Sequence, residues 1–435
     1  HVSSLLVVKK LRYYARFIVV SLLLNRRKLV SGLVDELQVL VDAYIKTFKP
    51  SDAAAWRLVL QEINLFLQVD RPLVLLDKSK DAPPISNRLN LPPSTLEGKP
   101  KLQEAILVGN CQNQVKFSEL TLDMFRIMQV LEREQGIVSR LPEPEDLEGS
   151  AHRPVNPHKF LLYRPSFSQL YVFLSTAFKE LSDNNVLLLY LSADSLSGDF
   201  HNDESKEKDK DKQALGDVVY RKGGLAMSST VLSSSPDSLE EPEQAPESPY
   251  GLYPEDLIPF TRKKMFVIVE SGNSLAFKSI QNVFGKPFLF LLSPTRREYG
   301  GEQRGNLFTL FLSAPLSAFC FMVGKTSVPQ DTYEKCEKSL SNSFEDVHKL
   351  LCNFESIPPA FHDFIEEDFL QSFILRFIFC YSVLYLHKSY QSKAAESLPQ
   401  SHPMLPMDFL SHPVVLSIVY KLASFLQVTD QFGQP

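Results

Sequence analysis

Cysteine is scarce in this chain of 435 residues, and its positions follow no metal-binding or disulfide pattern. The count is odd, the spacing is wide, and no two cysteines form a CxxC pair. These features argue against a disulfide framework and a zinc knuckle, and they favour a reducing compartment such as the cytosol or nucleus. The five residues are Cys111, Cys320, Cys336, Cys352 and Cys380.

Long hydrophobic runs are also missing. The run Phe17 to Leu24 is too short for a membrane span, which needs about 20 apolar residues. Arg376 interrupts the run from Phe373 to Leu386, and no secretory signal is visible. Because the chain begins with His1 rather than methionine, we expect a truncated or processed chain whose natural sequence extends upstream.

The signatures of common catalytic and cofactor sites are missing as well. The chain has no GxSxG, GxGxxG or HExxH motif. His362 and Glu366 lie one helical turn apart, but the neighbouring sequence supplies no third metal ligand. We therefore predict no catalytic residue, no metal, no cofactor and no enzymatic activity.

The net charge of −5 comes from one segment. Residues 197–249 hold 12 acidic and 6 basic side chains, which leaves 39 acidic and 40 basic side chains elsewhere. A nearly neutral body does not predict nucleic-acid binding by the whole surface. A basic cluster near the start is interpreted as the solvated side of a packed helix or as a surface that faces missing upstream sequence, with nucleic acid, acidic lipid or an acidic partner as alternatives. It comprises Lys9, Lys10, Arg12, Arg16, Arg26, Arg27 and Lys28.

Helical periodicity dominates the first part of the chain. It predicts three consecutive helices with short links, which form an antiparallel array in a helical domain of residues 1–135. Within this domain, residues 77–103 are rich in Pro, Lys and Asn and are interpreted as a long loop. The composition of residues 136–157 predicts a linker.

Residues 158–435 have a different pattern, in which short apolar runs alternate with helices. This pattern is typical of a parallel sheet covered on both faces. We predict an open, mostly parallel Rossmann- or flavodoxin-like sheet with four strands, followed by C-terminal helices, so the fold class is α/β plus all-α. The four apolar runs are 159–163, 186–191, 264–269 and 287–292.

An acidic insert, residues 197–259, separates the second and third predicted strands. Its composition predicts disorder, because it has too little apolar surface to bury. Ser235 and Ser248 each precede proline, and both are candidate phosphorylation sites.

Each predicted strand leads into a serine, at the sheet edge where α/β proteins bind ligands. Ser166, Ser192, Ser271 and Ser293 are therefore cleft candidates, although turns and helix caps also favour serine. The stretch MFVIVESGNS (265–274) is similar to the phosphate loop of flavodoxins, but Glu270 would repel a phosphate. A strand, a glycine turn and a capped helix explain it without a cofactor, and we prefer this interpretation. A nucleotide- or flavin-binding enzyme or sensor is the alternative function.

A second candidate is the segment TRREYGGEQRGN (295–306), whose arginines precede a predicted helix and are candidates for anion binding. A solvated basic loop is the simpler interpretation, because the motif of a nucleotide loop is missing. The three arginines are Arg296, Arg297 and Arg304.

Long stretches of the chain closely resemble the suppressor of cancer cell invasion family, and the resemblance spans nearly the whole sequence. The insert and residues 136–150 do not visibly match, and the family usually has more N-terminal sequence. The matching stretches are VVKKLRYYARFIVVSLLLN (7–25), VLQEI (59–63), GNCQNQVKFSELTLDMFR (109–126), NPHKFLLYRPSFSQLYVFL (156–174), FTRKKMFVIVESGNS (260–274), RGNLFTLFL (304–312) and RFIFC (376–380).

The resemblance implies a nuclear transcriptional corepressor, and it leaves room for a cytoplasmic pool. It implies that the partners are serum response factor and its myocardin-related coactivators, downstream of Rho and actin, with effects on cell migration. It also implies a link to chromatin-associated repair of DNA breaks. No catalytic residue of the family is carried over. We expect protein partners, and we expect neither direct nucleic-acid binding nor membrane binding.

Overall fold

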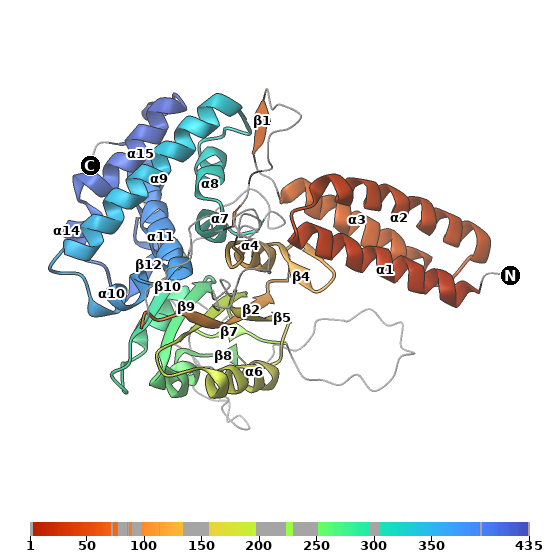
Figure 1. Cartoon of the computed structure of the whole chain (residues 1–435), viewed down its shortest axis with the longest axis horizontal. Helices are drawn as coiled ribbons and strands as arrows, with labels where there is room; N and C mark the ends of the chain where they lie inside the picture. The colour runs from red at the N-terminus through yellow and green to blue at the C-terminus, as the bar shows by residue number, and fades with distance from the viewer. Residues whose placement is uncertain are drawn as a thin grey trace, which may run out of the picture.

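The computed structural model describes most of the chain. The described residues are 3–70, 73–76, 85, 87–88, 98–112, 114–133, 156–196, 223–228, 251–295, 305–391 and 394–433. They form a body of α/β architecture from which a three-helix arm projects (Figure 1).

The arm consists of α1 (Ser4–Leu23), α2 (Arg27–Phe48) and α3 (Ala53–Val69). The three helices form the predicted array, and each buries an apolar stripe such as Leu33, Leu37 and Val41 in α2. The link between α2 and α3 is held by the Asp52 carboxylate. This carboxylate accepts hydrogen bonds from the Tyr44 hydroxyl at 3.2 Å and the Trp56 indole N–H at 3.1 Å.

The described residues of the body include a six-stranded sheet of order β12-β10-β9-β6-β2-β5. Only β12 runs antiparallel to its neighbour. This confirms the predicted open, mostly parallel sheet. The strands are β2 (Leu102–Asn110), β5 (His158–Tyr163), β6 (Val186–Ala193), β9 (Lys264–Glu270), β10 (Phe288–Leu292) and β12 (Gln400–His402).

Strand β2 corrects the sequence analysis, which predicted four parallel strands and grouped residues 102–130 with the N-terminal helices. In the structure β2 pairs with β6 on one side and β5 on the other. The predicted loop 77–103 therefore overlaps the first two residues of an inner strand. Gln103 and Glu104 interrupt the apolar pattern at the start of β2, which hid the strand. Helix α4 (Leu122–Val130) packs against the same strand.

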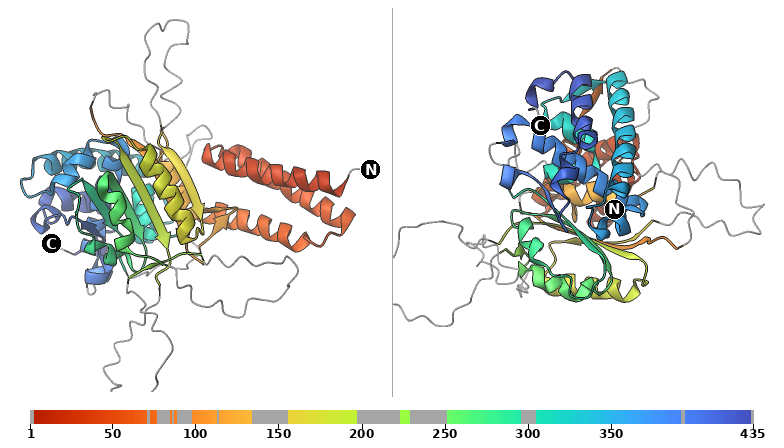
Figure 2. Two further views of the ribbon diagram at one scale, coloured as in Figure 1. Left: turned by 90° about the horizontal axis from the view of Figure 1, so that it is seen from below. Right: turned by 90° about the vertical axis from the view of Figure 1, so that its left-hand side faces the viewer.

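Both faces of the sheet are buried, which explains the continuous apolar runs in its strands. Tyr190 and Phe266 face a large core that also includes the arm, α4 and the C-terminal helices. Leu189 and Val267 face a smaller core beneath α6 (Phe167–Glu180). Figure 2 shows the C-terminal helices on one side of the sheet and α6 on the other.

The C-terminal part is helical, as predicted. Its main helices are α7 (Leu307–Ser313), α8 (Pro315–Met322), α9 (Gln330–Asn353), α10 (Pro359–Ile365), α11 (Asp368–Leu386) and α15 (Pro413–Phe425). Residues 307–322 form two helices, α7 and α8, because Pro315 begins a new helix.

The remaining elements are short. Among the described residues, three strand pairs lie outside the main sheet: β1 (Val74–Leu76) with β11 (Ser327–Pro329), β3 (Lys116–Phe117) with β4 (Leu120–Thr121), and β7 (Leu225–Ala226) with β8 (Gly251–Leu252). The other short helices are η2 (Pro254–Arg262), η3 (Ser274–Ser279), α12 (Lys388–Gln391), α13 (Ala394–Ser397), α14 (Met407–Leu410) and η5 (Thr429–Gln431).

Helix α11 is apolar and long enough to cross a membrane by composition, but 78% of its most apolar window is buried inside the protein. The Arg376 guanidinium in α11 donates hydrogen bonds to the Leu312 and Ser313 carbonyls at 2.8 and 3.2 Å. It thereby caps the C-terminal end of α7. Burial lowers the pKa of Arg376 to about 10. The contacts and burial identify α11 as a central core helix.

Candidate functional site

The four candidate serines do lie at the carboxyl edge of the sheet, and all four are buried. Ser166 caps α6, because its hydroxyl accepts from the Gln169 backbone N–H at 3.3 Å while the Gln169 side chain accepts from the Ser166 backbone N–H at 2.9 Å. Ser192 contacts Cys111, with 3.5 Å between its hydroxyl oxygen and the thiol sulfur. Both side chains therefore have partners within the protein.

Ser271 and Ser293 hold two neighbouring strand ends together. The Ser271 backbone N–H donates to the Ser293 hydroxyl at 3.1 Å, and this hydroxyl donates back to the Ser271 carbonyl at 3.2 Å. The Ser274 hydroxyl donates to the Ser293 carbonyl at 2.6 Å. The glycine turn in MFVIVESGNS thus connects β9 to β10 and η3. Residues 274–279 form a short 3-10 helix without a side-chain cap, in place of the capped helix that the sequence predicts.

Two segments of the acidic insert cover this edge, which corrects the prediction of disorder for residues 223–228 and 251–259. The Leu196 backbone N–H donates to the Gly224 carbonyl at 3.0 Å, and the Ala226 N–H donates to the Asp194 carbonyl at 2.8 Å. Leu225 and Leu252 are fully buried in the smaller core. The sequence prediction failed here because it used the average composition of the whole insert. These two short apolar segments contribute little to that average.

Side chains from the strand ends bind the same cover. The Asn273 amide donates to the Gly224 carbonyl at 2.8 Å and the Leu196 carbonyl at 3.2 Å. The Asn110 amide donates to the Ala226 carbonyl at 2.5 Å. Polar groups that a phosphate or flavin would need at this edge are therefore engaged by the chain itself. The geometry gives no support to a cofactor loop in MFVIVESGNS.

Glu270, the last residue of β9, is buried in a polar network with Thr309 and Tyr190. Its carboxylate accepts from the backbone N–H and hydroxyl of Thr309 at 3.1 and 3.0 Å. The Tyr190 hydroxyl lies 2.8 Å from the Thr309 hydroxyl. Burial raises the pKa of Tyr190 well above its ordinary value. The network joins the sheet to α7, and nothing in its geometry exposes these groups to a substrate.

A second buried network joins the arm to the body. Asp123 and Arg126 in α4 lie 3.5 Å apart, and burial raises the pKa of Asp123 despite the nearby guanidinium. The Asp123 carboxylate accepts from the Gln114 amide at 2.6 Å, while Arg126 donates to the Val69 carbonyl at 3.4 Å. Since Val69 ends α3, these contacts fix the base of the arm. Sequence reasoning missed them because the partners are far apart in the chain.

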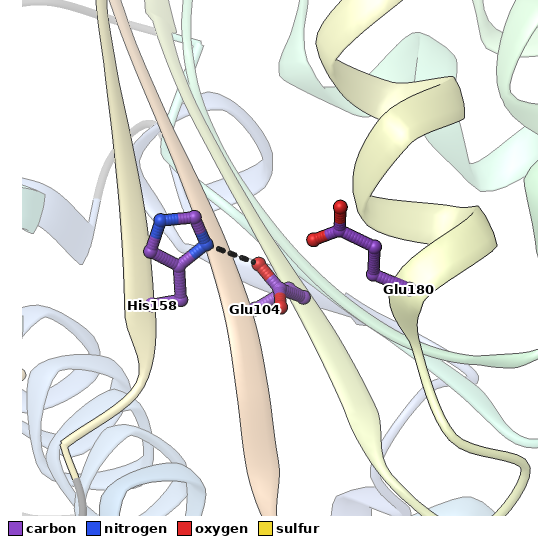
Figure 3. Close-up of side chains that lie close together, drawn as sticks. All are labelled: Glu104, His158 and Glu180. Atoms are coloured by element: carbon purple, nitrogen blue, oxygen red, sulfur yellow. Dashed lines mark hydrogen bonds and ion pairs between the residues drawn. The ribbon is translucent and has the colours of Figure 1, made fainter.

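One group of side chains among the described residues has the composition of a metal site: Glu104, His158 and Glu180, whose ligand atoms lie within 4.8 Å of one another. Figure 3 shows Glu180 extending from α6 toward the other two. Zinc ligands at about 2.0–2.2 Å from the ion would approach one another to about 3.4 Å. However, the buried Glu104 carboxylate is already bound by the His158 ring nitrogen at 3.0 Å. Pairing between strands β2 and β5 explains this contact without a metal.

The remaining candidates fall into two groups. Arg296, Arg297, Arg304, Ser235 and Ser248 lie outside the described residues. Of the basic cluster, Arg27 forms an ion pair with Asp70, which links the start of α2 to the end of α3. Six others, from Lys9 to Lys28, have exposed side chains on or next to the arm.

Known proteins are similar to this chain over nearly its whole length. A family described as "SCAI: Protein SCAI" matches residues 1–390. Protein SCAI of Mus musculus is 41% identical over 441 residues, which covers 98% of this chain and 70% of the relative. Protein SCAI of Homo sapiens is 42% identical with the same coverage. The Protein SCAI homolog of Dictyostelium discoideum is 31% identical over 589 residues, which covers 98% of this chain and 75% of the relative.

Proposed function

Because this chain belongs to the Protein SCAI family, we propose that it is a non-enzymatic transcriptional corepressor. It binds and inhibits the myocardin-related coactivators of serum response factor. In this way it limits Rho-dependent gene expression and cell migration, and it contributes to repair of DNA breaks. It acts in the nucleus, and a cytoplasmic pool exists as well.

The observation that carries a non-enzymatic role is the filled carboxyl edge of the sheet. An α/β enzyme would bind its ligand at this edge, but here Leu225 and Leu252 cover it from within the same chain. Asn110 and Asn273 bind the backbone of this cover instead of a ligand. A sheet whose ligand edge is closed can serve as a rigid support for protein-binding surfaces.

The arm supports the role of a protein-binding scaffold. It projects from the body (Figure 1) and presents large apolar side chains to solvent, including Leu6, Tyr13, Val39 and Leu58. Such side chains gathered on one projecting unit are typical of surfaces that bind other proteins. We therefore place the main partner-binding surface on the arm, with the body as its support.

Two measurements test the proposal. The tagged chain is expected to co-precipitate a myocardin-related coactivator and to repress a reporter gene driven by serum response factor sites. The control is a reporter with those sites mutated, which should be unaffected. Failure of the chain both to bind the coactivator and to repress the reporter would refute the proposed function.

Removal of residues 1–70 tests the role of the arm. We expect the shortened chain to lose repression, provided that its melting curve shows a folded body. Full repression by a folded chain without the arm would show that the body carries the partner-binding surface.

A further inference from the structure

One face of α1 carries a line of exposed apolar side chains. Leu6, Tyr13 and Val20 have exposed fractions of 59%, 60% and 48%. They are seven residues apart, so they form one narrow stripe along the helix, which we call the α1 stripe. Leu11 and Ile18, which α1 buries in the arm, lie on the opposite side. An apolar stripe of this spacing is suited to packing against another helix.

Basic side chains border the α1 stripe on both sides. Successive residues of a helix are rotated by about 100°, which places Lys10 on one side of the stripe and Lys9 and Arg16 on the other. All three are exposed, and α1 contains no acidic residue between Ser4 and Leu23. The stripe is therefore apolar in its centre and positive at its margins.

The α1 stripe is held in a fixed position by the rest of the arm and by the body. Helix α1 packs along α2 (Figure 1), and the Tyr14 hydroxyl donates to the Glu36 carboxylate at 2.7 Å. At the other end, the Gln129 amide donates to the Leu23 carbonyl at 3.2 Å. A surface that is ordered before binding loses less conformational entropy when a partner docks.

The charge pattern of the α1 stripe favours one kind of ligand among a second copy of the chain, a membrane surface and a helix of a partner protein. A second copy of the chain would bring two positive margins together, which is unfavourable. Insertion into a membrane surface requires a broad apolar face, whereas basic side chains border this stripe on both sides. A helix with apolar side chains between acidic ones complements this surface, because its apolar side chains pack on the centre of the stripe and its acidic side chains pair with the basic margins.

We propose that the α1 stripe binds an amphipathic helix of a partner protein, with the apolar residues of that helix flanked by aspartate or glutamate. The inference deepens the proposed corepressor function, on which it rests for the regulatory meaning of the complex. It specifies the chemistry of the partner segment and places its contact on Leu6, Tyr13 and Val20, with Lys9, Lys10 and Arg16 as the charged contacts.

The test uses the complete chain and a synthetic probe. The probe is a helical peptide of about 21 residues, with leucine at the core positions of three heptads and glutamate at the flanking positions. Fluorescence anisotropy is expected to show binding of this peptide and at least about tenfold weaker binding of a matched peptide with lysine in place of glutamate. Binding should weaken as salt is raised.

Substitutions locate the contact. Tyr13→Glu is expected to weaken binding of the glutamate peptide about tenfold or more. Val172→Glu on α6, which replaces an exposed apolar residue of the body, is the matched control and should change binding less than about twofold. Arg16→Glu should weaken the glutamate peptide and strengthen the lysine peptide. Melting curves of all variants check that the arm remains folded.

Other outcomes decide against the proposal. If the glutamate peptide does not bind, while vesicles of phosphatidylcholine with about one quarter phosphatidylserine do, the stripe is a membrane contact. If Tyr13→Glu converts a dimer to a monomer in light scattering, a second copy is the occupant. If the complete chain does not bind the glutamate peptide but still co-precipitates the coactivator, this inference is overturned and the proposed function stands. Peptide binding without co-precipitation would instead overturn the proposed function.

Discussion

The Glu270 carboxylate is bound by Thr309, 39 residues further along the chain, through the backbone N–H at 3.1 Å and the hydroxyl at 3.0 Å. Thr309 lies in the first turn of α7, where free N–H groups attract a negative charge. The carboxylate in the stretch that is similar to a phosphate loop thus anchors a helix to the sheet.

This relationship predicts the effect of Thr309→Val. The substitution removes the hydroxyl that contacts both Glu270 and the buried Tyr190 hydroxyl, so a buried polar group loses its partner. We expect the free energy of unfolding to fall by about 1–3 kcal/mol in urea titrations. Thr176→Val on the exposed side of α6 is the matched control, with a change below about 0.5 kcal/mol. Equal effects of the two substitutions would contradict the buried network.

The second prediction concerns Glu367, which precedes α11 and accepts from the Leu370 backbone N–H at 2.9 Å. Burial raises its pKa to about 7, opposed in part by this hydrogen bond. A carboxyl group with a raised pKa binds more protons in the folded state than in the unfolded state. Its contribution is therefore fully present below the unfolded pKa, near 4.5, and is lost as pH rises through about 7.

Glu367→Gln tests this pH dependence. The glutamine keeps an acceptor for the Leu370 N–H but does not ionise. Relative to the variant, the wild-type chain should lose stability between pH 5 and pH 8, by at most about 3 kcal/mol at about 1.4 kcal/mol per pKa unit. Urea unfolding at the two pH values measures the difference, with exposed Glu366→Gln as the control. A parallel pH dependence in wild type and Glu367→Gln would refute the assignment.

A third prediction separates the side-chain contact of Glu104 and His158 from a metal site. His158→Ala leaves the buried Glu104 carboxylate without this contact, and we expect a loss of about 1–2 kcal/mol in the free energy of unfolding. Glu180→Ala should be nearly neutral, because Glu180 is exposed. Zinc should not raise the melting temperature of the wild-type chain. A zinc-dependent rise that disappears in Glu180→Ala would establish a metal site instead.

The fourth prediction follows from the filled edge of the sheet. Ligands that bind only the folded state raise its stability, by about 2.7 kcal/mol at one hundred times the dissociation constant. We expect flavin mononucleotide, ATP and NAD at millimolar concentration to leave the melting temperature unchanged. We also expect the purified chain to be colourless. A rise of several degrees with any of these ligands would show that the cover formed by residues 223–228 and 251–252 opens.

Sequence by itself determined the elements whose pattern is local. The apolar runs that became β6, β9 and β10 were recognisable because both faces of the sheet exclude water there, so every position in these strands favours an apolar side chain. The run that became β5 was recognisable as well, although this edge strand is only partly buried. Helical periodicity identified the arm for a similar reason. The resemblance of long stretches identified the family, which the comparisons confirm.

Only the tertiary structure decided which distant segments meet. Strand β2 was hidden by Glu104, whose burial is possible because His158 lies opposite it in the sheet. The apolar segments of the acidic insert are buried only where the ends of the strands come together. Strand β12 pairs with β10, which lies more than one hundred residues earlier in the chain. Local periodicity predicts which side chains are buried. The choice of partner depends on the register of the whole sheet, which no single segment encodes.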